Sequence, residues 1–492
     1  MAPISSTQNG CCTRRAFLLG AGAGIVAGAG SAIAASTPLS AWMQQALAAW
    51  GKKGAASPSF SGSTTEVARP EYAMPGAFPG RVIEVKHPGS VKPDNTINAD
   101  AVKSMMDRGM CELTGADTPA AAWRRFFQPG DIVGIKVNPV GYRSPKDPWR
   151  GSGPLGVISS PEVLLEIVRG LKSAGIKPRD IIVFERYAVE FVDAGYESVM
   201  REREMDGVRW YASSYLGGSR QVDIEGFDDG SRAGCPPELA RHVVGYDPAV
   251  FAHMGFAAPE HDPKDDRRFR SHLSVIVSRM VDKLITIPVL KDHRSAGVTL
   301  ALKNLSHGMN NNVARSHLSN IARMDGSVSG PNQCNTFIPT AVSHHLTRQK
   351  ATLHILDGLL GVYEGGPGIW NQTWGTWQYK GLFFATDPVA MDHVGWDIID
   401  KKRAQEGWPP VAHMGLLQDS TAQKLSRGLA ALATAGNLQT LALASAGRNL
   451  EGGRGSEVFD RRQPEHIVLA GELGLGVFDA RAIEHRQIAL KA

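Results

Sequence analysis

Short apolar runs alternate along the chain with segments whose apolar residues recur at helical spacing. The ranges 80–88, 130–141, 180–186 and 282–290 carry apolar runs that predict strands, and the second is continuous enough to be buried on both faces. Between the second and third, 160–176 begins with Ser-Pro and keeps helical spacing up to a glycine. Strand, helix and strand in this order form a βαβ unit. The pattern therefore predicts an α/β fold whose sheet is mostly parallel, with helices on both faces and polar loop insertions.

The same alternation continues toward the end of the chain and is interrupted twice. We expect one α/β domain over 79–492, with a polar insertion near 212–272 and an Ala/Leu-rich helical excursion at 417–447. The remaining elements are expected at 99–110 and 120–127 (helices), 297–307 (helix), 351–361 (strand), 381–401 (strand, then helix) and 464–476 (helix with a glycine stop).

Residues 1–34 resemble a twin-arginine export signal. Arg14 and Arg15 are followed by Phe17 and by a Gly/Ala-rich apolar segment that ends in a small-x-small motif at 32–34. The resemblance implies that the folded chain crosses the membrane through the twin-arginine translocation machinery, loses the signal and resides in the periplasm. An uncleaved membrane anchor is the alternative for this segment.

The rest of the composition is that of a soluble protein. After a linker at 35–78, no segment approaches about 18 unbroken apolar residues, so we expect no stable membrane span after cleavage. The net charge of +5 is small for 492 residues and the basic residues are scattered, which argues against nucleic acid as a partner. Cys111, Cys235 and Cys334 form no C-x-x-C motif. We therefore expect no iron–sulfur cluster, while a disulfide between two of them stays open.

Polar side chains cluster where the apolar strands are expected to end. Ligands of parallel α/β sheets bind outside the carboxyl ends of the strands, so these positions are expected to converge on one rim. The five positions are Lys136 with Asn138, Glu185 with Arg186, Lys291 to His293, Asp357, and Asp387. Lys291 and His293 are two residues apart, so in an extended strand both side chains point the same way.

The segment 297–307 is expected to present a polar stripe to the same rim. Thr299, Lys303 and His307 follow one another at intervals of four residues and share one face of a helix. Lys303 either holds an anionic group with a depressed pKa, or lays its stem on apolar surface and extends its charge into water. A structural role is favoured for His307. His293 is a candidate metal ligand or general base, with a histidine that caps or solvates its loop as the alternative.

Three further segments carry candidates of weaker pattern. The Asn-rich stretch 308–317 is explained by an ordinary loop, with a substrate-contacting loop around Arg315 as the alternative. Glu364 lies in a Gly/Pro turn and can serve as an acid or base or as a ligand. Asp387 precedes a proline at the start of a helix, which is typical of an N-cap, and Asp392 and His393 are expected to be structural.

Four motifs in order give a family resemblance: "KVNPVG", "IPVLKDHRSAGVTLALKNLSHG", "ILDGLLGVYEGGPG" and "FFATDPVAMDHVG". They resemble the family described as domain of unknown function 362, DUF362, over roughly 130–400 and the "AGELGLGVFD" tail. The resemblance implies an α/β domain, sometimes accompanied by a ferredoxin-type cluster module. This chain lacks the cysteines of such a module. The resemblance implies a fold and a site, but no particular reaction.

Other catalytic motifs are missing from the sequence: there is no G-x-S-x-G, no H-E-x-x-H, no phosphate-binding P-loop and no G-x-G-x-x-G after a strand. We expect a periplasmic enzyme that acts on an anionic or oxygen-rich small molecule. Redox chemistry is slightly preferred over hydrolysis or elimination, because many twin-arginine clients carry cofactors. A solute- or metal-binding protein without turnover is the rival hypothesis.

The expected roles divide the candidates into three groups. Catalytic roles are predicted for Lys291, His293, Lys303 and Glu364, and substrate binding is predicted for Lys136, Asn138, Asn304 and Arg315. If a divalent or non-haem transition metal is bound, its ligands are expected among His293, Glu185 and Asp357.

Overall fold

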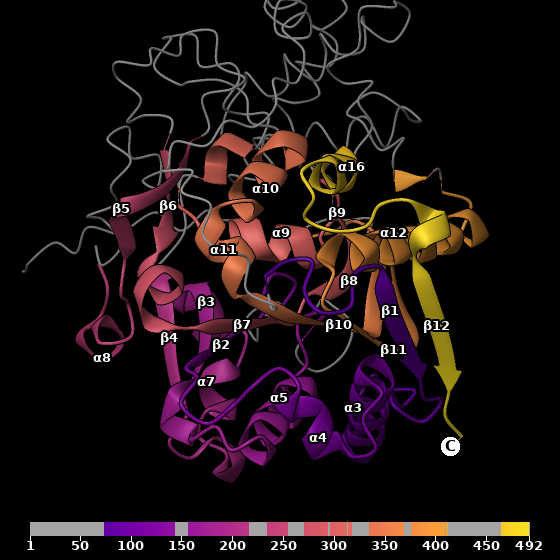
Figure 1. Ribbon diagram of the computed structural model, residues 1–492, viewed down its shortest axis with the longest axis horizontal. Helices are drawn as coiled ribbons and strands as arrows, with labels where there is room; N and C mark the ends of the chain where they lie inside the picture. The colour runs from indigo at the N-terminus through magenta and orange to yellow at the C-terminus, as the bar shows by residue number, and fades with distance from the viewer. Residues whose placement is uncertain are drawn as a thin grey trace, which may run out of the picture. The chain divides into compact units, whose positions relative to one another are not determined.

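The main sheet contains ten strands, eight of which follow one another in the order β12-β1-β11-β10-β7-β2-β3-β4, with β8 and β9 attached beside β10 (Figure 1). The strands are β1 Arg81–Lys86, β2 Val133–Lys136, β3 Ile181–Tyr187, β4 Arg209–Ser214, β7 Lys283–Thr286, β8 Val289–His293, β9 Gly297–Val298, β10 Ala351–Glu364, β11 Gly375–Ala385 and β12 Glu484–Ala489. This computed structural model describes residues 73–142, 156–215, 234–253, 270–293, 296–311, 313–316, 334–368, 375–408, 410–411 and 464–491.

Seven of the eight strands in this row run in the same direction. Neighbours are parallel throughout the row except where β11 pairs with β1 and with β10, and both of those pairings are antiparallel. The predicted α/β fold with a mostly parallel sheet is therefore confirmed.

The helices of the described residues are α3 Ala99–Thr114, α4 Pro119–Arg124, α5 Pro161–Ser173, α6 Ala188–Asp193, α7 Tyr196–Val199, α8 Pro237–Ala240, α9 Leu300–His307, α10 Cys334–Val342, α11 His345–Lys350, α12 Pro388–Gln405 and α16 Glu465–Glu472. Short turns of other helix types lie at Pro178–Asp180, Arg203–Met205, Ile276–Met280, Val313–Ser316 and Ala480–Ala482.

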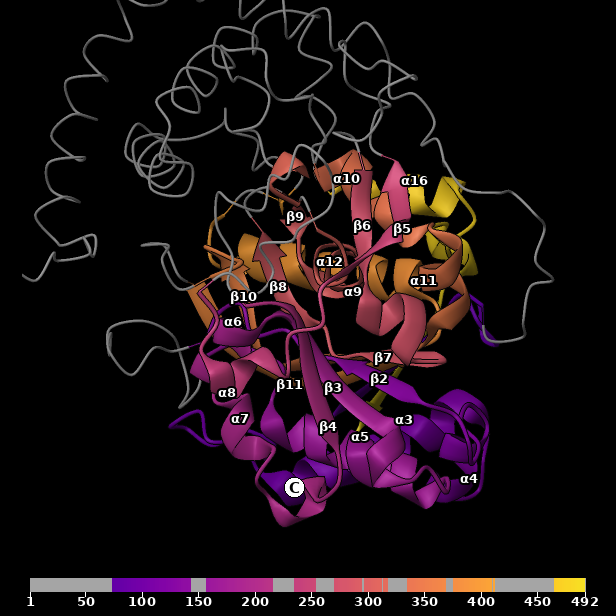
Figure 2. The ribbon, with the colours of Figure 1, turned by 90° about the vertical axis from the view of Figure 1, so that its left-hand side faces the viewer.

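Alternate residues of the central strands enter two separate hydrophobic cores. In β3, Ile181 and Val183 belong to one core, whereas Ile182 and Phe184 belong to the other. The first core includes buried residues of α3, α4 and α5, and the second includes those of α9, α10, α12 and α16. Figures 1 and 2 show these two groups of helices on opposite faces of the sheet. Burial on both faces explains why the strand sequences are continuous apolar runs.

Helix boundaries follow local signals in the sequence. Helix α3 begins after Asn98, whose side chain accepts hydrogen bonds from two backbone N–H groups of the first turn, and it ends at Gly115 with φ +72°. Helix α9 begins three residues later than predicted, because Gly297 and Val298 form β9 and pair with β8. The predicted helix at 160–176 corresponds to α5, which has a proline in its first turn.

The single strand predicted at 282–290 is divided into β7 and β8. Ile287 still donates its N–H to the carbonyl of Lys136, which continues the pairing of β7 with β2. The next residue, Pro288, has no N–H, and its carbonyl accepts from the N–H of Asp357 in β10. From there the chain pairs with the distal half of β10. This change of partner carries the end of β8 past the ends of β7 and β2.

Some predicted segments lie wholly or partly outside the described residues. These are the expected signal at 1–34, most of the linker at 35–78 and the helical excursion at 417–447. The described part of the insertion near 212–272 contains α8 and the two-stranded antiparallel sheet of β5 Tyr246–His253 and β6 Arg270–Ser274.

Two further findings concern the membrane and the cysteines. None of the helices in the described ranges is both long and apolar enough to cross a membrane. Cys111, Cys235 and Cys334, all of them described, are thiols and not disulfides.

Candidate functional site

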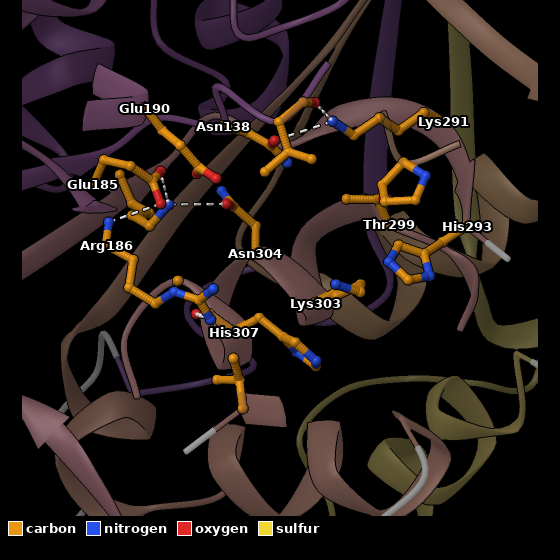
Figure 3. A pocket seen from close by; sticks show the side chains of 15 residues that line it. Asn138, Glu185, Arg186, Glu190, Lys291, His293, Thr299, Lys303, Asn304 and His307 are labelled. Carbon is orange, nitrogen blue, oxygen red and sulfur yellow. Dashed lines mark hydrogen bonds and ion pairs between the residues drawn. The ribbon is translucent and has the colours of Figure 1, made fainter. Parts of the chain in front are cut away.

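A pocket of about 210 Å³ lies at the carboxyl ends of β2, β3 and β8. This is the place where ligands of parallel α/β sheets bind. Figure 3 shows the two carboxylates of the pocket on one side of the space and Lys291 with His293 on the other. Its walls hold four cationic side chains and two carboxylates: Lys136, Arg186, Lys291, Lys303, Glu185 and Glu190.

Strand β8 supplies Lys291 and His293, which both line the pocket as their two-residue spacing predicted. The ammonium group of Lys291 is buried and donates to the side-chain oxygen of Asn138 at 3.0 Å and to the carbonyl of Val140. Burial, reinforced by the charge of Lys303, lowers the pKa of Lys291 to about 7. Nδ1 of His293 accepts the N–H of Ala296 at 3.1 Å, so a neutral His293 carries its proton on Nε2.

Lys136 at the end of β2 and Glu185 near the end of β3 form a buried ion pair. Nζ of Lys136 also donates to the carbonyl of Val137 at 2.6 Å and to the side-chain oxygen of Asn304 at 3.3 Å. Burial lowers the pKa of Lys136, although Glu185 acts in the opposite direction. Because its donors are directed at protein oxygens, Lys136 fixes the wall of the pocket.

Gly308 makes room for this lysine at the end of α9. A Cβ on Gly308 would lie 2.2 Å from Cε of Lys136 and 2.5 Å from the carbonyl oxygen of Asn304. The glycine therefore allows the close approach of α9 to β2.

Arg186 and Glu190 complete the wall on the β3 side. Arg186 donates to the carbonyl of His307 at 2.9 Å and stacks on the ring of Tyr187 at 4.1 Å. Glu190 lies on α6, and burial together with the charge of Glu185 raises its pKa to about 7. Among the described residues, the Glu190 carboxylate has no hydrogen-bond partner. Glu190 was not predicted from the sequence, because it lies on the short helix after β3 and belongs to no recognisable motif.

Helix α9 brings Lys303, Asn304 and His307 to the pocket, and Thr299 precedes its first turn. The helix has no side-chain cap of its own. Instead, the carboxylate of Asp392 on α12 accepts the N–H groups of Ala301 and Leu302 at 2.7 and 2.9 Å. Asp392 is fully buried, and it acts as a cap supplied by another helix. This confirms the expectation that Asp392 is structural.

Lys303 and Asn304 present donors to the pocket that the described protein does not use. Lys303 is 9% exposed, and its ammonium group has no hydrogen-bond or ion-pair partner among the described residues. Nδ2 of Asn304 is buried and likewise without a described partner, although Oδ1 accepts from Lys136. Burial lowers the pKa of Lys303 to about 8.

His307 is held by hydroxyl groups on both sides of its ring. Nδ1 lies 3.0 Å from Oγ of Ser306 and Nε2 lies 2.7 Å from Oγ of Ser316. Both ring nitrogens are therefore engaged within the protein, which agrees with the structural role favoured by the sequence.

Several predicted site residues are not brought into the pocket. Asp357 lies within β10, which continues to residue 364, and its carboxylate accepts the N–H groups of Ser160 at 2.8 Å and Leu359 at 3.0 Å. Glu364 forms a buried ion pair with Arg403 at 2.6 Å and does not line the pocket.

Two other predicted site residues, Asp387 and Arg315, are not placed at the pocket, for different reasons. The expectation that Asp387 shares the rim is wrong, because it follows β11, whose direction is opposite to that of the other strands. Asp387 instead caps α12, as its position before a proline predicted. The side chain of Arg315 lies outside what the structure describes.

The three predicted metal ligands do not form one set. Glu185 and His293 line the pocket, whereas both oxygens of Asp357 accept backbone N–H groups elsewhere. In the described ranges, no group of three or more His, Cys, Asp or Glu side chains has the arrangement of a metal site. The predicted ligand set therefore does not fit a metal ion.

The polar residues contributed by β8 and α9 belong to a segment with a recognisable family pattern. Residues 256–397 match a family model described as "Domain of unknown function (DUF362)". This match supports the DUF362 family. No curated protein matches the chain. The matched segment includes Lys291, His293, Lys303 and Asn304, whereas Lys136 and Glu185 precede it. The pocket is thus built jointly by matched and unmatched parts of the chain.

Proposed function

We propose that this pocket binds a small anionic, oxygen-rich molecule and that the protein is an enzyme that transfers protons to and from it. Two donors carry the most weight: the ammonium group of Lys303 and Nδ2 of Asn304, neither of which has a described protein partner. A buried donor without a partner is costly, and a ligand oxygen removes that cost. The excess of cationic side chains over carboxylates favours an anion.

The proposed roles follow from what each side chain contacts. Lys136 and Lys291 hold the walls through their bonds to Glu185 and Asn138, while Lys303 and Asn304 contact the ligand. Glu190 serves as the acid or base, because its pKa of about 7 lets it both give and take a proton near neutral pH. Since the predicted metal ligands do not converge, we do not extend the proposal to metal-dependent redox chemistry.

Isothermal calorimetry with oxalate as the probe tests the binding step. Wild-type protein is expected to bind oxalate at pH 7, and Lys303→Gln is expected to bind it at least about tenfold more weakly, which corresponds to about 1.4 kcal/mol. Lys103→Gln is the matched control, because this side chain is 54% exposed and lies on α3, on the opposite face of the sheet. Equal oxalate affinity for Lys303→Gln and wild type would refute the proposed site.

A measurement of turnover distinguishes the proposed enzyme from a binding protein. Glu190→Gln is expected to retain oxalate binding and to lose turnover of any substrate found for the wild-type protein, because the glutamine cannot exchange a proton at neutral pH. If the wild-type protein binds the anion tightly but converts none of the compounds tested, the rival hypothesis of a solute-binding protein is supported instead.

We also propose that the chain is exported to the periplasm by the twin-arginine machinery. This proposal is supported by the arginine pair and the Gly/Ala-rich apolar segment of residues 1–34. Replacing Arg14 and Arg15 together by lysine preserves the charge and is expected to keep the full-length chain in the cytoplasm of a host with this pathway. Undiminished release of the double variant by osmotic shock would contradict the proposal.

A further inference from the structure

The three lysines of the pocket differ in what their ammonium groups contact. Lys136 is paired with Glu185, and Lys291 donates to two protein oxygens. Lys303 is more than nine-tenths buried, lines the same pocket and has no hydrogen-bond or ion-pair partner in the described ranges. Two lysines are therefore fixed parts of the wall, and the third, Lys303, which is labelled in Figure 3, is available to a ligand.

The surroundings of Lys303 also make its amine reactive. Burial favours the neutral form of its side chain and outweighs the opposite effect of Cys334 and Glu190. The neighbouring charges of Arg186 and Lys136 act in the same direction as burial. A pKa of about 8 leaves a useful fraction of the amine unprotonated near neutral pH. A desolvated lysine close to other cations is the arrangement that activates an amine as a nucleophile.

We propose that Lys303 is a nucleophile that forms an imine with a small oxo acid, an aldehyde or ketone that carries a carboxylate. This inference rests on the proposed function and names the substrate class of the same site. The carboxylate of such a molecule would be attracted by the excess of cationic side chains and would accept a hydrogen bond from the unused N–H of Asn304. The carbonyl group would react with the unpartnered amine of Lys303. The volume of about 210 Å³ favours a compact molecule, since pockets for drug-sized ligands span about 300–1,000 Å³.

The step balances with groups that line the pocket. The lone pair of neutral Lys303 attacks the carbonyl carbon, and the C=O π electrons move to the oxygen to give a carbinolamine after proton transfer from nitrogen to oxygen. Protonated Glu190 then gives one proton to the hydroxyl group, which leaves as water while the nitrogen lone pair forms the C=N bond. The products are a protonated imine, one water molecule and ionised Glu190. Addition of water reverses the sequence, so no oxidant or reductant is consumed.

Reductive trapping on the full chain tests this inference. Protein is incubated with glyoxylate and sodium cyanoborohydride, digested, and searched by mass spectrometry for the reduced adduct. We expect an adduct on Lys303 that requires both reagents, that excess oxalate suppresses, and that exceeds labelling of any exposed lysine at least about tenfold. Lys103→Arg should label at Lys303 like wild type, whereas Lys303→Arg should show no adduct in that peptide.

Three results would overturn the inference. The adduct can be absent from Lys303, it can be spread over lysines in proportion to their exposure, or propionaldehyde can label Lys303 as fast as glyoxylate does. The last result would remove the requirement for a carboxylate.

Oxalate binding separates the failure of this inference from that of the proposed function. Lys303→Arg keeps the positive charge and is expected to keep most of the oxalate affinity while losing the adduct. If wild type binds oxalate but traps no glyoxylate, the imine is refuted and the anion site stands. If wild type does not bind oxalate, both are refuted.

Discussion

Glu190 and Lys303 titrate near neutral pH for the same physical reason. Burial penalises the charged form of each group, which raises the pKa of the carboxyl to about 7 and lowers that of the ammonium to about 8. Neither effect is encoded in the local sequence. Lys303 was recognisable because it follows an apolar run at helical spacing from Thr299. Glu190, in contrast, belongs to no motif. Its environment arises where side chains of β2, β3, β8 and α9 meet at the pocket.

The affinity for an anion is expected to fall as pH rises from 6 to 9. A bound anion stabilises protonated Lys303 and protonated Glu190, so it raises both pKa values above those of the unliganded protein. Affinity is therefore full below the unliganded values, and it declines first above about 7, where Glu190 ionises, and again above about 8, where Lys303 loses its charge. Lys291, with a pKa of about 7, adds to the first decline.

Calorimetric titrations with oxalate, which stays a dianion over this range, measure the effect. We expect at least about a tenfold loss of affinity between pH 6 and pH 9. Glu190→Gln should reduce the decline near pH 7 and leave that near pH 8. An affinity independent of pH in the wild type would contradict these assignments.

At the scale of single elements, α9 is positioned by contacts that no sequence pattern reveals. Its predicted polar stripe is correct, since Thr299, Lys303 and His307 all line the pocket. Its N-terminus, however, is capped by Asp392, which is about ninety residues away in sequence. Glu364 pairs with Arg403, which is 39 residues away in sequence, and this contact draws a predicted catalytic carboxylate into a buried ion pair. Such partners depend on how α12 packs, so the sequence could identify the side chains and not their roles.

Asp392→Asn tests whether this cap positions the site. An amide has one acceptor oxygen and would direct its NH₂ group at a backbone N–H, so we expect a loss of about 2 kcal/mol in the free energy of unfolding. Oxalate affinity should fall as well, because α9 carries Lys303 and Asn304. Urea unfolding followed by calorimetry measures both quantities. Asp397→Asn, on the exposed face of the same helix, is the matched control, and equal stability of the two variants would exclude the capping role.

At the scale of the whole molecule, the order of strands decides which predicted residues meet. The apolar runs predicted the parallel sheet correctly, and residues after β2, β3 and β8 do converge. The direction of β11 could not be inferred from its own sequence, because its buried apolar part, residues 381–385, would look alike in either orientation. For that reason Asp387 was expected at the rim and lies elsewhere. The break at Pro288 between β7 and β8, after which β8 reaches the pocket, depends likewise on pairing with β10.

The central claim is that this pocket is an anion site at which Lys303 contacts the ligand. A crystal structure of the wild-type protein with selenate, read from the anomalous signal of selenium, tests it most directly. We expect a selenium peak inside the pocket, with selenate oxygens within hydrogen-bonding distance of Nζ of Lys303 and Nδ2 of Asn304, and no such peak in Lys303→Gln crystals. A pocket without anomalous density under conditions that label other surface sites would contradict it.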